Sequence, residues 1–227
     1  MIPTNIIQTY KTWDSIPDKY LEYINKLKEL HPDYTYMFFD DNDIEIFMNT
    51  KYPQFRTLYD SFIYNIQRLD LFRILAVYEF GGFYFDIDVE ITQSLDDLLN
   101  HNVIFPVEFN EEHVITFLKT NRLQYLLNKV KLQSLSDQLG QYAFASKRKH
   151  DFLEKFIYYI MNNPIPKNEL TSSNKEEYVM STTGPRLLTL AYMEYHNKND
   201  IILLSPQEYK PHQFGDYGDH HMMGSWK

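Results

Sequence analysis

The chain has 227 residues and contains no cysteine. This absence excludes a disulfide framework, a zinc site built on thiolates and a cysteine nucleophile. Any metal site in the protein must therefore be built from oxygen and imidazole ligands.

Positive charge and long apolar runs are also scarce. The 22 Lys and Arg residues face 31 Asp and Glu residues, a formal net charge of -9 at pH 7, which repels phosphate backbones and anionic membranes. No apolar run approaches the roughly 18 residues that span a bilayer, and the first residues lack the basic and apolar parts of a signal peptide. We therefore expect a cytoplasmic protein with no nucleic-acid partner and no integral membrane segment.

Aromatic residues, in contrast, are abundant. Hydrophobic residues make up 44% of the chain, which includes 19 Tyr and 16 Phe, and a disordered chain does not carry so much apolar surface. The length suits one compact domain of the larger sort, with enough buried surface to form a core. We expect a folded protein with a single domain over residues 1–227.

Short apolar runs alternate with helical patterns along the first half of the chain. The patterns predict strands at 2–10, 34–39, 83–91, 142–146 and 201–204, and helices at 18–30, 40–48, 62–80, 151–161 and 186–196. Strands that alternate with helices are typical of an α/β protein with a parallel sheet. Because the second half is less regular, we predict a mixed, mostly parallel central sheet flanked by helices.

Glycine is the other scarce residue, and two of the seven glycines, Gly81 and Gly82, end the helix predicted before an aromatic strand. That strand carries Asp86 and Asp88, whose side chains would point to the same side because a strand repeats every two residues. Two carboxylates so placed are costly to bury without a partner, and a hard cation such as Mg²⁺ or Mn²⁺ is a suitable one. The alternative is that both aspartates end a strand in solvent.

The helix before this strand carries Asp70 and Arg73. Residues three apart lie on the same helix face, so the two side chains are neighbours. Taken alone, such a pair is an ordinary ion pair. Its position immediately before the two aspartates connects it with the predicted metal site.

Four segments in order resemble glycosyltransferase family 32, the sugar transferases with a D-X-D motif, whose central block the large glucosylating cytotoxins share. The segments are Ile2-Pro3 with Gln8-Thr9-Tyr10-Lys11, then Arg68-X-Asp70-X-X-Arg73 with Gly81-Gly82-X-Tyr84-X-Asp86-X-Asp88, then Thr183-Gly184-Pro185, and His220-His221-Met222-Met223-Gly224-Ser225-Trp226. Two positions depart from the family pattern: Ile7 replaces a frequent His and Tyr10 a frequent Trp. Because the ring of Tyr10 has a smaller π-face than that of Trp, the resemblance does not determine which nucleotide base the donor carries.

The resemblance implies a GT-A-like (Rossmann-like) domain. Residues 1–99 would form its nucleotide-sugar-binding half, and residues 100–227 its acceptor-side half with a metal-binding lid. The implied activity is that of a metal-dependent hexosyltransferase, which moves a hexose from UDP- or GDP-hexose to a hydroxyl of a glycan, lipid or protein acceptor. The resemblance also implies retention of the anomeric configuration and a place in polysaccharide biosynthesis.

The resemblance further assigns roles to individual residues. Asp86, Asp88 and His221 would bind the metal, with His220 as the alternative imidazole ligand. The implied catalytic residues are Asp70, Arg73, Asp86 and Trp226, and the implied donor-binding residues are Gln8, Thr9, Tyr10, Asp70, Arg73, Tyr84, Asp86, Ser225 and Trp226.

Two other readings of the aspartate pair remain open. A haloacid-dehalogenase-type phosphatase also has a strand that ends in D-X-D, but that motif requires Thr or Val where this chain has Glu90, and it usually opens the fold. A nucleotide-sugar-binding module without turnover would keep the fold and lose the chemistry. Slow donor hydrolysis would distinguish a transferase from such a module.

Overall fold

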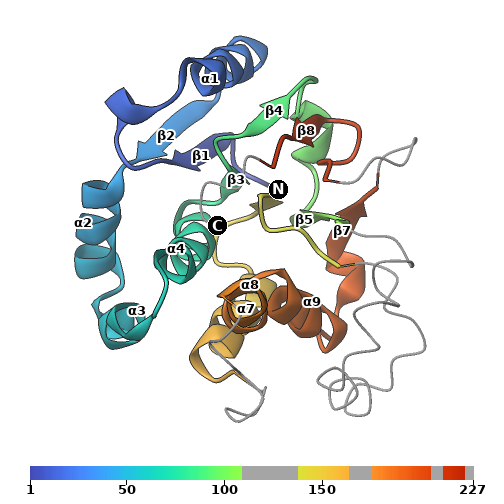
Figure 1. The fold of residues 1–227 in the computed structure, drawn as a ribbon. Coiled ribbons are helices and arrows are strands. Elements are labelled where there is room, and N and C mark those ends of the chain that lie inside the picture. The colour runs from blue at the N-terminus through green and yellow to red at the C-terminus, as the bar shows by residue number, and fades with distance from the viewer. Residues whose placement is uncertain (109–137, 164–174, 206–211, 223–227) are drawn as a thin grey trace.

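The computed structural model describes residues 1–108, 138–163, 175–205 and 212–222, and a six-stranded sheet forms its centre (Figure 1). The strands lie in the order β2-β1-β3-β6-β5-β7, and three of the five pairings are parallel, since only those of β6 are antiparallel. The predicted mixed, mostly parallel sheet is therefore confirmed. Its strands are β1 (Asn5–Thr9), β2 (Thr35–Phe39), β3 (Gly82–Phe85), β5 (Val103–Pro106), β6 (Ala143–Ser146) and β7 (Ile201–Leu204).

Helices cover one face of this sheet, and the other face is covered by one helix together with a small second sheet (Figure 1). The helices are α1 (Asp18–Leu30), α2 (Asp41–Lys51), α3 (Arg56–Ser61), α4 (Asn65–Phe80), α7 (Asp151–Met161), α8 (Lys175–Thr182) and α9 (Pro185–Met193). Ile7 of β1 packs into the core under α2, α4 and α7, whereas its neighbour Ile6 packs with Leu27 of α1 on the opposite face. The second sheet pairs β4 (Val89–Ile91) with β8 (Gly218–His220) on the face that α1 covers.

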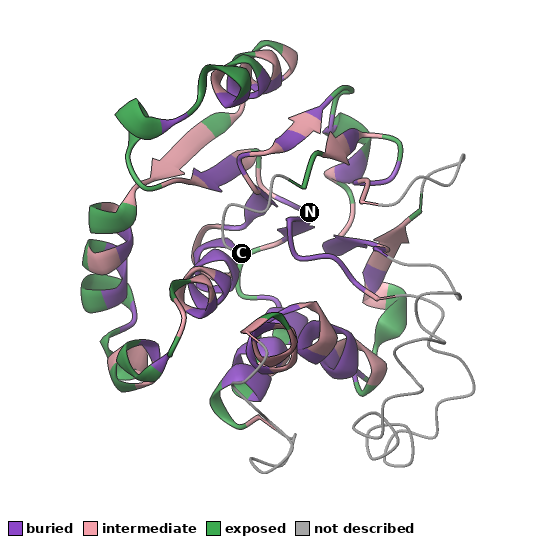
Figure 2. Cartoon of the chain, viewed as in Figure 1, coloured by how far each residue is buried: buried purple, intermediate pink, exposed green. Residues whose placement is uncertain are grey.

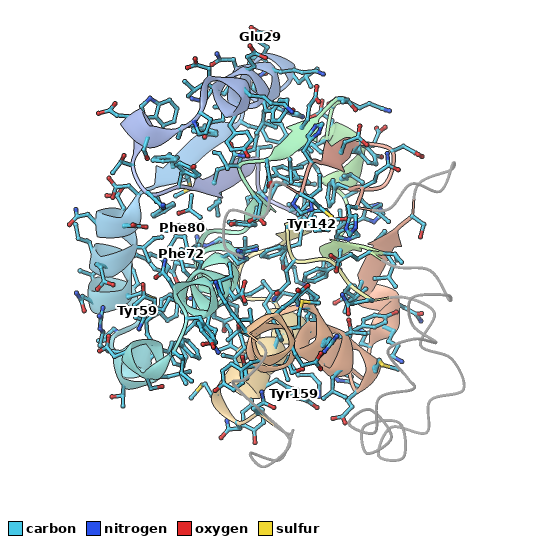
Figure 3. The ribbon with its side chains drawn as sticks, in the orientation of Figure 1. Glu29, Tyr59, Phe72, Phe80, Tyr142 and Tyr159 are labelled. Carbon is cyan, nitrogen blue, oxygen red and sulfur yellow. The ribbon has the colours of Figure 1, made fainter. Side chains whose placement is uncertain are left out.

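Aromatic rings hold α4 against α2 and β2. The ring centroid of Phe72 lies 5.2 Å from that of Phe39 and 5.4 Å from that of Phe47, both edge to face, and Phe80 stacks on Phe39 beside them. Figure 3 labels Phe72 and Phe80, the two residues that α4 contributes to this group. Such pairs add about 0.5–1.5 kcal/mol each beyond the area that they bury. Most of α4 is accordingly buried, while the outer faces of α1 and α2 are exposed (Figure 2). The core therefore fixes the helix that carries Asp70 and Arg73.

The ends of several predicted elements differ from the structure by a few residues, and one predicted strand is divided in two. The helix predicted over 62–80 starts at Asn65, because residues 62–64 separate it from the short α3. The strand predicted over 83–91 is two strands, β3 and β4, in two different sheets. A turn in which the Val89 amide donates to the Asp86 carbonyl (3.0 Å) separates them, so a turn and not strand alternation brings Asp86 and Asp88 together.

Gly82 is a position that no other residue fits. Its φ is +104°, and a Cβ there would lie 2.4 Å from the Asn5 carbonyl oxygen of the neighbouring strand. We expect Gly82→Ala to lower the free energy of unfolding by roughly 2–4 kcal/mol, from backbone strain and displacement of β1. Urea denaturation measures the loss. Gly215→Ala is the control, because it adds strain at φ +55° while its nearest contact, at 3.1 Å, is a side chain. Equal losses in the two variants would contradict the clash with β1.

Candidate active site

A cleft of about 530 Å³ opens at the edge of the sheet where β1 and β3 end. In open α/β sheets, ligands bind at the carboxyl ends of the strands. The residues that line it come from both halves of the chain, and among them are Thr9, Tyr10, Lys11, Asp41, Ile63, Asp70, Arg73, Tyr84, Asp86, Asp88, Glu108, Gln141, Val179, Met180, His212, His220 and Met222.

A buried arginine at the base of the cleft lies between two carboxylates. Arg73 Nη1 lies 3.2 Å from Asp86 Oδ1, and Arg73 Nη2 lies 3.5 Å from Asp70 Oδ1. The side chains of Arg73 and Asp70 are 7% and 6% exposed, whereas that of Asp86 is 27% exposed. Arg73 Nη1 also donates to the Gln141 carbonyl oxygen at 3.2 Å. Asp70 and Arg73 are therefore more than a surface ion pair, because they continue into the first aspartate of the motif.

Burial and charge oppose each other in this group. Burial raises the pKa of Asp70 to about 6, although Arg73 and a hydrogen bond from Thr183 Oγ1 (2.7 Å) act to lower it. Burial likewise raises the pKa of Asp86, again against Arg73. Burial alone would lower the pKa of Arg73, but the surrounding acidic groups, foremost Asp86, raise it above its ordinary value. Arg73 thus stays charged and stabilises the ionised form of both carboxyls.

Tyr84 and Gln8 fix the position of Asp86. The Tyr84 hydroxyl donates to Asp86 Oδ1 at 2.7 Å, and Gln8 Nε2 donates to the Asp86 carbonyl oxygen at 3.4 Å. Gln8 Oε1 accepts in turn from the Tyr36 hydroxyl at 3.0 Å. Gln8 is 1% exposed and is not among the residues that line the cleft. It therefore supports Asp86 from behind and does not face the cleft, although the family resemblance had implied that it binds the donor.

Asp86, Asp88 and His220 form a triad of possible metal ligands, and their ligand atoms all lie within 4.8 Å of one another. His220 Nε2 lies 3.3 Å from Asp88 Oδ1, and the His220 ring stacks on Tyr142 with centroids 4.2 Å apart. Two carboxylates and one imidazole can hold a divalent transition-metal ion, and water or phosphate oxygens would complete its shell.

His221, the imidazole predicted as a ligand, points elsewhere. Its Nε2 lies 3.2 Å from Glu90 Oε2 and its ring stacks on Tyr23, while its backbone amide donates to the Asp88 carbonyl oxygen at 3.1 Å. Neighbouring residues of an extended segment face opposite sides, so only one of the two histidines can face the aspartates. The structure places His220 there, which is the imidazole that the sequence left as the alternative ligand.

The other predicted site residues divide into two groups. Thr9, the last residue of β1, and Tyr10, which follows it, line the cleft, and Thr9 Oγ1 donates to the Phe39 carbonyl oxygen at 2.7 Å. Ser225 and Trp226 lie outside the described residues. Sequence reasoning missed Glu108, Gln141 and His212, which line the cleft and belong to no motif. It named Thr183 within the Thr183-Gly184-Pro185 segment but did not foresee it as the hydrogen-bond partner of Asp70.

Curated proteins similar to this chain are mannosyltransferases of fungi. The inositol phosphoceramide mannosyltransferase 3 of Schizosaccharomyces pombe is 43% identical over 100 residues, which are 44% of this chain and 28% of that protein. A mannosyl phosphorylinositol ceramide synthase of Saccharomyces cerevisiae is 29% identical over 222 residues, 93% of this chain and 50% of that protein. The chain thus spans about half, or less, of the length of these relatives.

A similar fold occurs in a solved structure, the PaToxG glycosyltransferase. The two superpose with a TM-score of 0.57 over 86% of this chain and 71% of that one, at 15% sequence identity. A likeness at this level of identity concerns the fold alone, and it confirms the predicted GT-A-like architecture.

The sequence profile of a family described as "Glycosyltransferase sugar-binding region containing DXD motif" matches residues 17–105. This region runs from the start of α1 to β5 and contains Asp70, Arg73 and the Asp86-X-Asp88 motif. The resemblance inferred from the sequence is confirmed: in residues 17–105 the chain carries the sugar-binding region of the DXD-motif glycosyltransferases, family 32.

Proposed function

We propose that the protein is a hexosyltransferase that uses a nucleotide sugar and a divalent cation. The observation that carries the proposal is the juxtaposition, in one cleft, of the Asp86, Asp88 and His220 triad with the buried Asp70 and Arg73 pair. The carboxylates of Asp70 and Asp86 beside the fixed guanidinium of Arg73 offer hydrogen-bond acceptors and one donor group to sugar hydroxyls, while the triad suits a metal-bound diphosphate.

The reaction breaks the bond between the anomeric carbon of the donor hexose and the β-phosphate oxygen. The same carbon then bonds to the oxygen of the acceptor hydroxyl, and the proton of that hydroxyl leaves with the diphosphate. The products are a glycoside and a nucleoside diphosphate. In a retaining reaction, the acceptor attacks from the face that the diphosphate leaves, and its proton passes to the departing phosphate oxygen. Asp70 and Arg73 would orient the hexose.

The ligand set favours Mn²⁺ over Mg²⁺. Magnesium is held mainly by carboxylates, water and phosphates, whereas an imidazole such as that of His220 is a ligand of transition metals. The cation would stabilise the charge of the departing diphosphate as a Lewis acid. With a net charge of -9, the protein itself has little positive charge to offer in its place.

The names of the relatives suggest a donor sugar and an acceptor. They name mannose as the transferred sugar and inositol phosphoceramide as an acceptor, so we propose mannose and a glycolipid hydroxyl for this chain. None of the helices over the described ranges combines the length and hydrophobicity of a membrane-spanning segment.

Donor hydrolysis tests the proposal directly. We expect GDP-mannose, UDP-glucose, UDP-galactose or UDP-N-acetylglucosamine to be hydrolysed slowly in the presence of Mn²⁺, because a transferase lets water replace its acceptor. The reaction is measured by chromatography of the released nucleoside diphosphate, in reactions with and without EDTA. Binding of a nucleotide sugar without hydrolysis by any donor would instead identify a binding module. Metal-dependent release of inorganic phosphate from phosphate monoesters would identify a phosphatase.

A further inference from the structure

The cleft follows the order of the strands along one edge of the sheet. β5 is antiparallel to β6, which is antiparallel to β3, so β1, β3 and β5 run in the same direction and their carboxyl ends share an edge. Tyr10 follows β1, Asp86 follows β3 and Glu108 follows β5, and all three line the cleft. Figure 1 shows β1 and β5 on opposite sides of β3. The metal-ligand triad therefore lies between an end with Tyr10 and an end with Glu108.

The two ends of the cleft have different chemistry. The β1 end adjoins the parallel β1–β2 pair and the start of α2. In open α/β sheets a nucleotide binds outside the carboxyl ends of the strands where the strand order reverses, which in this sheet is between β1 and β3. The donor hexose and its diphosphate would extend from there to the triad. The end with Glu108 and His212 is then left for the second substrate, since the transfer needs an acceptor hydroxyl on the far side of the hexose.

Glu108 is a fixed carboxylate at that end. The residue is 9% exposed, its backbone amide donates to the Gln138 carbonyl oxygen at 2.7 Å, and its Oε2 accepts from Gln138 Nε2 at 2.9 Å. Its Oε1 lies 3.6 Å from His212 Nδ1. A carboxylate can accept about four hydrogen bonds, so Glu108 keeps capacity for ligand hydroxyls after the bond from Gln138.

His212 adopts an uncommon backbone conformation beside it. Its φ of +64° lies in the left-handed region, which costs energy for a residue other than glycine and concentrates at functional sites. Its carbonyl oxygen accepts from the His220 amide at 2.9 Å, which ties the conformation of His212 to the strand that presents the metal ligand. Through this backbone bond, His212, which contacts the Glu108 side chain, has a fixed position relative to the triad.

We propose that Glu108 binds the acceptor, and that the acceptor presents a polyhydroxylated ring whose hydroxyls donate to this carboxylate. This inference rests on the proposed hexosyltransferase function and assigns Glu108 to the acceptor alone, apart from donor and metal. Hydrogen bonds from hydroxyls to an ionised carboxylate are roughly twice as strong as neutral ones, so one fixed carboxylate suffices to orient a sugar or cyclitol ring.

The test separates acceptor use from donor use. We expect Glu108→Gln to hydrolyse the donor with a rate and a donor KM within about twofold of the wild type, while kcat/KM for transfer falls about 10- to 100-fold, as for loss of a hydrogen bond to a charged group. The acceptor probes are myo-inositol, methyl α-mannoside and detergent-solubilised inositol phosphoceramide. Glu108→Asp should recover part of the transfer. The glutamine side chain can still accept from Gln138, so the variant should fold.

Two control variants and a binding measurement keep the outcomes distinct. Glu29→Gln makes the same change at an exposed residue that does not line the cleft and should leave both reactions unchanged, whereas Tyr10→Ala should raise the donor KM instead. If Glu108→Gln lowers hydrolysis and transfer equally, the acceptor role is wrong. Absence of hydrolysis in the wild type refutes the hexosyltransferase function instead. If the wild type transfers to no probe, saturation-transfer NMR of the polyols with nucleoside diphosphate and the diamagnetic Mg²⁺ decides the question. Signals that are present in the wild type and lost in Glu108→Gln support the site, and absence of any signal in the wild type overturns it.

Discussion

Asp88→Asn is expected to abolish donor hydrolysis and transfer, with a loss of roughly 100- to 1000-fold or more, while the protein stays folded. Asparagine has the shape of aspartate but lacks its charge, so the triad loses metal affinity without a cavity being formed. The melting temperature gives a second readout. Mn²⁺ and a nucleoside diphosphate together should raise the wild-type melting temperature by more than the sum of their separate shifts, because three protein ligands leave the metal shell incomplete and the phosphates would complete it. Asp88→Asn should lose this synergy.

Asp96→Asn is the matched control for this prediction. Asp96 accepts from the Tyr34 hydroxyl at 2.8 Å and does not line the cleft, so its loss of charge should leave hydrolysis and the thermal synergy unchanged. Metal-dependent hydrolysis that survives in Asp88→Asn would show that the cation binds elsewhere.

Arg73→Met is expected to lower the free energy of unfolding by about 3–5 kcal/mol at pH 7, because it removes the only cation paired in the described structure with the buried Asp70 and with Asp86. Stability should also depend on pH. A folded pKa of Asp70 near 6 lies above its unfolded value, so the folded state binds more protons between about pH 4 and 6 and stability falls as pH rises through that window. Without Arg73 both carboxyl pKa values rise further, and the penalty should be smaller at pH 5 than at pH 7. Urea denaturation at the two pH values measures both effects.

A second substitution checks the cause of this loss. Arg73→Met combined with Asp70→Asn should recover part of the stability, because one unpaired carboxylate is removed. Arg56→Met is the surface control, since Arg56 pairs with exposed carboxylates and should change stability little. If the double variant is no more stable than Arg73→Met alone, lost packing of the long side chain explains the destabilisation instead.

The sequence predicted the local part of the site well. Asp70 and Arg73 are neighbours because of helix geometry, and Gly81 and Gly82 end that helix immediately before a buried strand. All of this is determined by contacts between residues close in the chain. The alternation of apolar runs with helical patterns therefore predicted the central sheet and its helices, and the spacing of the motif, together with the family resemblance, predicted the aspartate pair.

The rest depends on contacts between distant residues, which no local pattern specifies. β5 and β8 are only four and three residues long, too short for a clear period, and so the register that selects His220 over His221 was not visible. Glu108 acquires its place only because β5 joins β6 and β7 in the sheet. The turn between β3 and β4 was hidden by a continuous run of strand-forming residues.

The pairing of β8 with β4 also affects the order in which the protein folds during its synthesis. The residues paired in this sheet are far apart in the chain, since Val89 pairs with His220. The side chains of Glu90 and His221, which meet beside the sheet, are 131 positions apart. During synthesis, the strands and helices up to β5 can emerge and begin to associate while the third ligand of the triad has not yet been made. Closing so long a loop is slow compared with forming a helix, so the triad assembles late in folding. A chain truncated before residue 220 would therefore contain the D-X-D motif but lack His220, and we expect such a product to be inactive.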